Sequence, residues 1–137
     1  MLDRKATATA HPNIAFIKYW GNRDDELRLP ANPSLSMNLG DLVTTTSVAF
    51  DETLERDNVT IDDQPAGEAA RARASGHLDL VRDRAGLRGV SARVVSRNNF
   101  PIGAGIASSA SGFAALTVAA CAAAGLELAE EIGRAHV

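Results

Sequence analysis

Cysteine and lysine are scarce in this chain of 137 residues, and a long apolar run is missing. The single cysteine, Cys121, excludes a disulfide framework and a cysteine-based metal site. Because no run of about eighteen apolar residues occurs, we expect no membrane-spanning helix. The N-terminus, Met-Leu-Asp-Arg-Lys, also lacks the apolar core of a secretory signal. These absences predict a cytoplasmic protein without a membrane partner.

The rest of the composition is that of an ordinary globular domain. Apolar residues make up 45% of the chain, which is enough for a core, and the length fits one domain. The formal net charge of −3 does not suggest a nucleic-acid partner. Cys121 stands in an alanine-rich stretch, so we expect it to be a small buried residue.

The last six residues, Ile-Gly-Arg-Ala-His-Val, read as foreign to the domain. They match the translation of a common sequencing adapter in a frame that reaches a stop codon next. We therefore expect one incomplete N-terminal domain over residues 1–131 and an adapter-derived tail over 132–137. On this interpretation the natural protein is longer, and the given chain alone is inactive.

The pattern of apolar and polar residues predicts strands followed by a helix, a strand, a glycine-rich loop and a second helix, which is an α+β domain. A turn or hairpin is expected over residues 21–33, where glycine, aspartate and proline gather. The run 13–20 reads as a largely buried strand. The expected strands are 6–10, 13–20, 34–39, 43–50, 53–61 and 90–97, and the expected helices are 67–85 and 106–124.

Residues 98–113 carry the strongest functional signal. They read as a glycine- and serine-rich loop that enters a helix, and a helix N-terminus offers unpaired N–H groups to an anion. Gly103 and Gly105 allow close approach of the backbone to a ligand. A Walker loop is excluded because no lysine follows Lys18, and a dinucleotide fingerprint is excluded because Ser108 stands where its third glycine belongs. The pattern suits a polyphosphate.

Lys18 is the second informative residue. Lysine occurs only at positions 5 and 18, and the rest of the 14 basic residues are arginines. Lys18 lies inside an apolar run, where an ammonium group is costly unless an anion accompanies it. An edge-strand lysine that reaches solvent is the plainer interpretation, but its retention among arginines favours a role for a compact charge.

Four segments together resemble the diphosphomevalonate decarboxylase family of the GHMP kinase superfamily. They are Asn13-Ile-Ala-Phe-Ile-Lys-Tyr-Trp-Gly21, Asn32-Pro-Ser-Leu-Ser36, Thr44-Thr-Thr46 and the run that begins Asn99-Phe-Pro. The resemblance covers nearly all of residues 6–130. It implies the GHMP-kinase N-terminal domain, a mixed sheet packed against helices, and a homodimer as the complete protein. It also implies ATP and Mg²⁺ as cofactors for converting mevalonate 5-diphosphate to isopentenyl diphosphate.

The same resemblance implies the roles of individual residues. Lys18 and Asn13 would be catalytic, near the carboxylate and hydroxyl end of the substrate, and Ser108 would also be a ligand of the metal. The residues implied for substrate binding are Tyr19, Trp20, Asn22, Ser34 and Ser36. Those implied for ATP binding are Pro101, Gly103, Gly105, Ala107, Ser108, Ser109, Ala110 and Ser111.

Asn22 departs from the family pattern, in which many members carry a lysine there. Loss of this charge leaves open a phosphomevalonate decarboxylase that yields isopentenyl phosphate, as well as simple variation at a tolerant turn. A mevalonate-type kinase without decarboxylation is a further alternative, as is a nucleotide-binding or structural α+β module without catalysis. Asp24 and Asp25 read as turn residues. The substrate-phosphate-binding segment and the catalytic aspartate of the family lie downstream of this chain.

Overall fold

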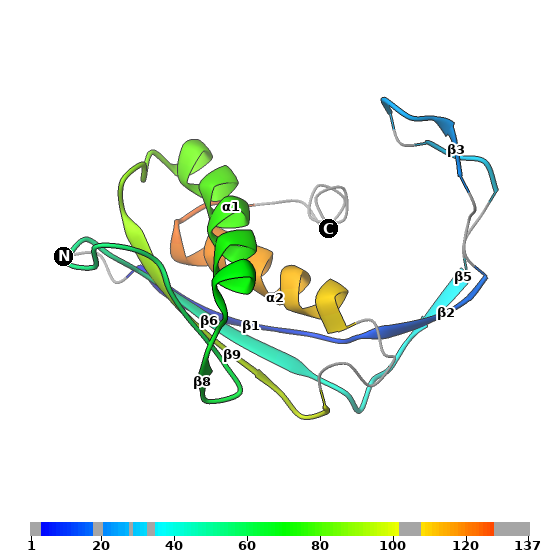
Figure 1. Cartoon of the computed structure of the whole chain (residues 1–137), viewed down its shortest axis with the longest axis horizontal. Helices are drawn as coiled ribbons and strands as arrows, with labels where there is room; N and C mark the ends of the chain where they lie inside the picture. The colour runs from blue at the N-terminus through cyan, green and yellow to red at the C-terminus, as the bar shows by residue number, and fades with distance from the viewer. Residues whose placement is uncertain (1–3, 18–20, 28, 33–34, 102–107, 128–137) are drawn as a thin grey trace.

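The structure is a computed structural model that describes residues 4–17, 21–27, 29–32, 35–101 and 108–127. One sheet carries five strands in the order β1-β6-β9-β7-β8, and two helices cover one of its faces (Figure 1). The strands are β1 Lys5–Ala10, β6 Thr44–Asp51, β9 Ser91–Asn98, β7 Asn58–Ile61 and β8 Gln64–Pro65, and the helices are α1 Glu68–Ala85 and α2 Ser108–Ala123.

All strand pairs in this sheet are antiparallel except β7 with β9, which run parallel. The chain passes from β7 through β8 and α1 before it returns as β9, since parallel neighbours need a long crossover. The mixed sheet and its two helices confirm the predicted α+β class. Within the described part, neither helix combines the length and the apolar character needed to cross a membrane.

The core lies between the helices and the sheet. Inward residues of β6 alternate strictly with outward ones, as a strand with one covered face requires. Alanine dominates the buried side of α2, which confirms that this helix packs against the sheet. Gly86 ends α1 with a φ of 69°, a left-handed conformation that glycine adopts without strain. The buried core residues include Val48, Phe50, Leu78, Val81, Ala92, Val94, Leu116 and Cys121.

His77 of α1 and Thr117 of α2 join the two helices through a polar contact. The Thr117 hydroxyl donates to the carbonyl of Phe113 at 2.7 Å, which uses its one proton. The 2.6 Å contact between His77 Nε2 and Thr117 Oγ1 therefore needs His77 as the donor. The ring of His77 also meets Phe113 edge-on, with 5.4 Å between centroids. These contacts assign the proton of His77 to Nε2.

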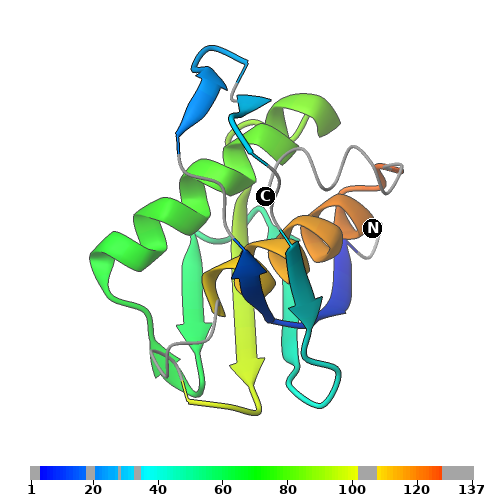
Figure 2. The same ribbon diagram turned by 90° about the vertical axis from the view of Figure 1, so that its right-hand side faces the viewer.

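Two short antiparallel ribbons extend from the sheet (Figure 2). Strand β2 (Asn13–Ile17) pairs with β5 (Leu35–Asn38), and β3 (Asn22–Asp24) pairs with β4 (Leu29–Pro30). The predicted strands at 13–20 and 34–39 and the predicted hairpin at 21–33 are thus present in the described residues. The expectation that 13–20 is largely buried is wrong for Ile14 and Phe16, which are 43% and 61% exposed. A two-stranded ribbon covers neither of its own faces, and α2 packs against β2 over a few residues.

The predicted strand 53–61 begins later than expected. Its first residues form a turn in which the Asp51 carboxylate accepts the N–H of Thr53 at 2.8 Å and its hydroxyl at 2.6 Å. These two bonds lower the pKa of Asp51 and hold the chain in a turn where alternation predicts a strand. The strand then starts at Asn58.

Candidate functional site

The structure describes some of the predicted site residues and leaves others outside the described part. Asn13 lies on β2, Ser36 on β5 and Asn22 on β3, while Pro101 follows β9. The segment Ser108–Ser111 begins α2, as the sequence predicts. The residues outside the described ranges are Lys18, Tyr19, Trp20, Ser34, Gly103, Gly105 and Ala107.

The first turn of α2 is suited to an anion. The helix begins at Ser108 and runs for 16 residues, and its first turn contains no acidic residue. The first N–H groups of a helix have no partner within the helix, and the positive end of its dipole lies there, so this turn lacks a carboxylate of its own to compensate them. The ribbon of β2 and β5 leaves the sheet beside this end of α2, and α2 contacts β2 (Figure 1). The predicted phosphate and substrate segments are thus neighbours.

The ribbon presents two chemically different faces. Asn13 is opposite Asn38, and Ser36 is opposite Ala15, so three polar residues share one face. The intervening pair, Ile14 opposite Met37, belongs to the other face. The two predicted site residues of the ribbon, Asn13 and Ser36, therefore lie on the same face. Asn13 is half-buried and Ser36 is exposed.

The side chain of Asn22 forms a hydrogen bond within its own hairpin. Its side-chain Nδ2 donates to Asp25 Oδ1 at 3.2 Å, and the N–H of Leu27 donates to Asp24 Oδ1 at 2.9 Å. Asp24 and Asp25 thus act as turn residues, as predicted. The Asn22 amide is exposed and brings no positive charge to this position.

The inward-facing residues of the sheet change from apolar to polar towards the first turn of α2. Inward pairs between β6 and β9 are apolar at one end, where Val48 is opposite Val94. At the other end the inward pairs are polar. Thr44 donates its hydroxyl to Asn98 Oδ1 at 2.6 Å, and Thr46 Oγ1 lies 3.0 Å from Ser96 Oγ. This polar end lies under the first turn of α2, since Thr44 Oγ1 also contacts Ser111 Oγ at 2.8 Å.

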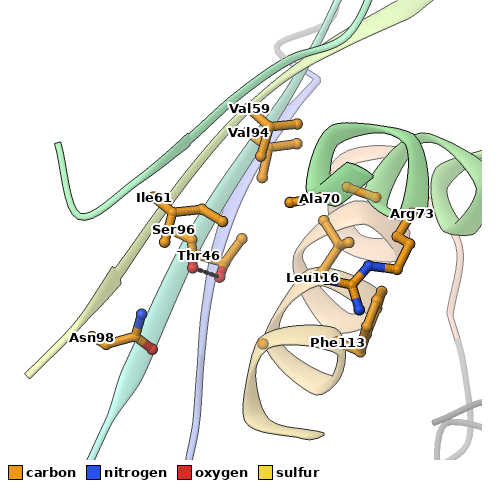
Figure 3. A pocket seen from close by; sticks show the side chains of 12 residues that line it. Thr46, Val59, Ile61, Ala70, Arg73, Val94, Ser96, Asn98, Phe113 and Leu116 are labelled. Atoms are coloured by element: carbon orange, nitrogen blue, oxygen red, sulfur yellow. Dashed lines mark hydrogen bonds between the residues drawn. The ribbon is translucent and has the colours of Figure 1, made fainter. Parts of the chain in front are cut away.

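A cavity of about 220 Å³ opens between the sheet, α1 and the first half of α2 (Figure 3). Its walls are mainly apolar. Thr46, Ser96 and Asn98 form a polar end, and Arg73 adds a guanidinium. Sequence reasoning did not identify this cavity, although the alternation of Thr46 and Ser96 with apolar neighbours marks its polar end. The lining residues are Thr46, Val59, Ile61, Ala70, Arg73, Ala74, Val94, Ser96, Asn98, Gly112, Phe113 and Leu116.

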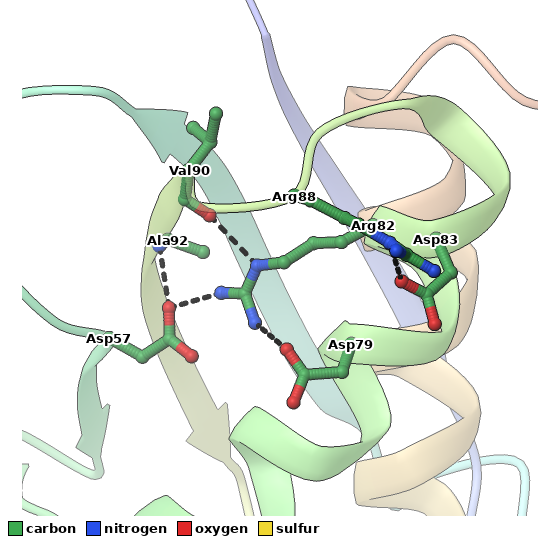
Figure 4. Close-up of polar contacts among 7 residues, drawn as sticks. All are labelled: Asp57, Asp79, Arg82, Asp83, Arg88, Val90 and Ala92. Carbon is green, nitrogen blue, oxygen red and sulfur yellow. Dashed lines mark hydrogen bonds and ion pairs between the residues drawn. The ribbon is translucent and has the colours of Figure 1, made fainter.

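A separate polar cluster lies where α1 ends (Figure 4). The guanidinium of Arg82 donates to Asp57, to Asp79 Oδ1 at 2.7 Å and to the Val90 carbonyl at 2.8 Å. Asp57 Oδ1 also accepts the N–H of Ala92 at 2.8 Å. Asp57 and Arg82 are buried, and the cluster connects α1 to Asp57 before β7, to Val90 before β9 and to Ala92 of β9. This cluster stabilises the fold.

The described residues contain no group of three or more His, Cys, Asp or Glu side chains that could hold a metal ion. Magnesium usually binds to one or two protein oxygens together with phosphate oxygens of a substrate.

Residues 10–135 match the family model described as "Diphosphomevalonate decarboxylase-like N-terminal domain". The diphosphomevalonate decarboxylase of Candida albicans is 40% identical over 125 residues, which are 83% of this chain and 34% of that protein. The chain thus spans about a third of the length of this relative. The match runs past residue 131, and the adapter-derived tail stays a prediction.

Solved structures agree with this similarity. The mevalonate diphosphate decarboxylase of Staphylococcus aureus superposes with a TM-score of 0.86 at 36% identity, covering 98% of this chain and 40% of that one. A structure described as MDDEF in complex with MVAPP, AMPPCP and magnesium superposes with a TM-score of 0.78 at 42% identity, covering 91% of this chain and 38% of that one. The predicted fold is thereby confirmed.

Proposed function

Because the chain belongs to the diphosphomevalonate decarboxylase-like family, we propose that the protein, at the length of its relatives, converts mevalonate 5-diphosphate to isopentenyl diphosphate with ATP. The observation that carries this proposal is the family match, which includes the serine-rich start of α2. A second supporting feature is the position of the β2–β5 ribbon beside that start. The given chain supplies the N-terminal part of this activity.

ATP and Mg²⁺ fit the described residues. The first turn of α2 offers N–H groups without an acidic neighbour, and the adjoining cavity of about 220 Å³ has the apolar walls and polar end that a nucleoside needs. We assign the phosphates to the main chain between Pro101 and Ser111, and the metal to Ser108 together with phosphate oxygens. When bound, ATP supplies the phosphoryl group that turns a tertiary hydroxyl into a leaving group.

The substrate is assigned to the ribbon and the segments that flank it. Lys18 would hold the carboxylate and hydroxyl end of the substrate by its charge, and Asn13 would orient the same end by hydrogen bonds. The remaining proposed substrate contacts are Tyr19, Trp20, Asn22, Ser34 and Ser36.

The two lysines of this sequence, Lys5 and Lys18, allow a test of the proposed activity. In a protein of the relatives' length, Lys18→Ala should remove most of the CO2 release from mevalonate 5-diphosphate and leave binding of an ATP analogue unchanged. Lys5→Ala is the matched control, because Lys5 is the other lysine of the given sequence and lies exposed on β1. Equal turnover in both variants would overturn the role of Lys18. Phosphorylation without CO2 release in the parent protein would instead identify a kinase.

Asn22 supports a second candidate, a decarboxylase of mevalonate 5-phosphate. The amide of Asn22 is held by Asp25 and supplies no charge for a second phosphate. If charge at this position selects the substrate, Asn22→Lys should shift kcat/KM towards the diphosphate. An unchanged ratio of the two kcat/KM values would reject the idea that charge at position 22 selects the substrate.

We also propose that the protein acts in the cytoplasm as a homodimer at the length of its relatives. Family resemblance supports the dimer, and the composition supports the location. Light scattering of the purified protein would test the oligomeric state, since a monomeric mass would reject it.

A further inference from the structure

We infer that Asp62 positions the start of α2 for nucleotide binding, through a chain of hydrogen bonds that crosses the end of the sheet. Asp62 lies in the turn between β7 and β8, on the far side of β9 from β6. Asp62 contacts Asn98 of β9, and the chain continues through Thr44 of β6 to Ser111 of α2. The inference rests on the proposed ATP site and adds a residue that lies outside it.

Four contacts form this chain. Asp62 Oδ1 accepts the N–H of Asn98 at 2.7 Å, and Asp62 Oδ2 accepts the side-chain Nδ2 of Asn98 at 3.3 Å. Asn98 Oδ1 accepts the hydroxyl of Thr44 at 2.6 Å. The Thr44 oxygen then contacts the Ser111 oxygen at 2.8 Å. A carboxylate outside the helix layer is thereby connected to the first turn of α2.

The chemistry of the groups fixes the direction of every bond. An ionised carboxylate only accepts, so Asn98 must present its NH₂ group to Asp62 and its oxygen to Thr44. Thr44 has one hydroxyl proton and donates it to Asn98. Ser111 is therefore the donor in the contact with Thr44. All donors point away from α2, and the chain ends on a negative charge, which strengthens hydrogen bonds that feed it.

Burial makes this arrangement rigid at the helix end. Thr44 is 0% exposed and Ser111 is 2% exposed, so neither hydroxyl can exchange its partner for water without opening the packing. At the other end, the N–H of Asp62 donates to the Ser96 carbonyl at 2.9 Å and ties the turn to β9. These contacts thus fix β9, the β7–β8 turn and the first turn of α2 relative to one another.

This geometry gives Ser111 a positioning role. In this chain of contacts the Ser111 hydroxyl points to the sheet and donates to Thr44, so its proton is not directed at a phosphate. The contribution of Ser111 to ATP binding is then the placement of the main-chain N–H groups of its turn. Asp62 secures that placement by fixing the amide of Asn98.

The neighbouring aspartate provides a matched control. Asp62 and Asp63 have φ values of 49° and 66°, so glycine is accepted at either position without strain. Both carboxylates are exposed, but Asp63 pairs only with Arg97 at 2.8 Å and does not touch the chain of contacts. Asp62→Gly and Asp63→Gly therefore remove the same chemical group from adjacent residues of one turn.

Two measurements on the protein at the length of its relatives test this role. Amide hydrogen exchange over residues 112–115, whose N–H groups bond the carbonyls of the first turn of α2, should accelerate about tenfold in Asp62→Gly, as loss of a bond to a charged acceptor implies, and should stay at the parent rate in Asp63→Gly. The Kd of a non-hydrolysable ATP analogue with Mg²⁺ should rise about tenfold in Asp62→Gly and stay unchanged in Asp63→Gly. Asp62→Asn should fall between the parent and Asp62→Gly, because its single amide oxygen can accept from the Asn98 N–H or from Asn98 Nδ2 but not from both, as the two carboxylate oxygens do.

Equal exchange at 112–115 in the two glycine variants would overturn the positioning role. So would faster exchange in Asp62→Asn than in Asp62→Gly. Comparable melting temperatures of the two glycine variants separate positioning from general destabilisation. If the parent chain does not bind the ATP analogue at all, the proposed ATP site fails, and the exchange comparison still decides whether Asp62 holds the helix start.

Discussion

Replacement of Asp57 by alanine should destabilise the domain more than any loss of a surface ion pair. The Asp57 and Arg82 side chains are only 6% and 7% exposed, and their contact is the buried member of the cluster in Figure 4. Removal of one partner leaves a guanidinium in a region that water does not reach, where an uncompensated charge is costly. The same substitution also leaves the N–H of Ala92 without its acceptor, and Ala92 is fully buried.

The expected loss in the free energy of unfolding of Asp57→Ala follows from these two effects. Breaking a buried ion pair from one side costs about 3–5 kcal/mol, a range that includes reorganisation around the remaining charge. Arg82 keeps its bonds to Asp79 and to the Val90 carbonyl, which favours the lower half of that range. The orphaned Ala92 N–H accounts for about 1–3 kcal/mol by itself. A domain of this size has about 5–15 kcal/mol in total, so the variant should melt roughly 10–20 °C lower.

Urea unfolding followed by circular dichroism measures this loss directly. Asp79→Ala is the control, because Asp79 also pairs with Arg82 but its side chain is 65% exposed. That variant should lose no more than about 1 kcal/mol. Asp57→Asn keeps an acceptor for Ala92 and should fall between the two. If Asp57→Ala loses no more than Asp79→Ala, the argument from burial is refuted.

Three further predictions concern the helices. Gly86→Ala should cost about 1–2 kcal/mol because its φ is positive, whereas Gly67→Ala should cost little because its φ is −61°; thermal melts compare them. Burial raises the pKa of the Cys121 thiol, so it should react slowly with iodoacetamide until the protein unfolds. The thiol of the unfolded chain therefore ionises at a lower pH than the thiol of the native state. The free energy of unfolding should fall as pH rises above the ordinary thiol pKa, and Cys121→Ala should lack this decline. His77 should carry its neutral proton on Nε2, which ¹⁵N chemical shifts report, and Thr117→Val should abolish that preference.

Periodicity and turn chemistry predict most of this fold. β-Branched residues over 43–50 predict β6, and the glycine at position 86 marks the end of α1. The error at residues 53–57 arises because Asp51 forms a local turn through Thr53, and a side chain that bonds its own backbone outweighs strand propensity. The exposure of Ile14 and Phe16 was not predictable in the same way, because burial depends on what covers a face and not on the strand itself.

The candidate site could be predicted only where it is local in the chain. The serine-rich start of α2 is a contiguous signal, and α2 (Ser108–Ala123) lies within the predicted helix 106–124. Asp62, by contrast, lies 36 residues from Asn98, and nothing in its neighbourhood distinguishes it from Asp63. Their roles differ because the β7–β8 turn directs the Asp62 carboxylate at Asn98 and the Asp63 carboxylate at Arg97, two neighbouring residues of β9. Such pairings follow from the register of the sheet, which the sequence pattern alone does not determine.

The inward face of the sheet shows where stability was not the only requirement. Val48 and Val94 fill one half of that face, and apolar pairs of this kind would stabilise the other half equally well. Thr46, which is buried, and Ser96, which is half-buried, stand there instead, joined by one hydrogen bond that contributes little net free energy. This polar half adjoins both the cavity and the first turn of α2, where we propose that the nucleotide binds.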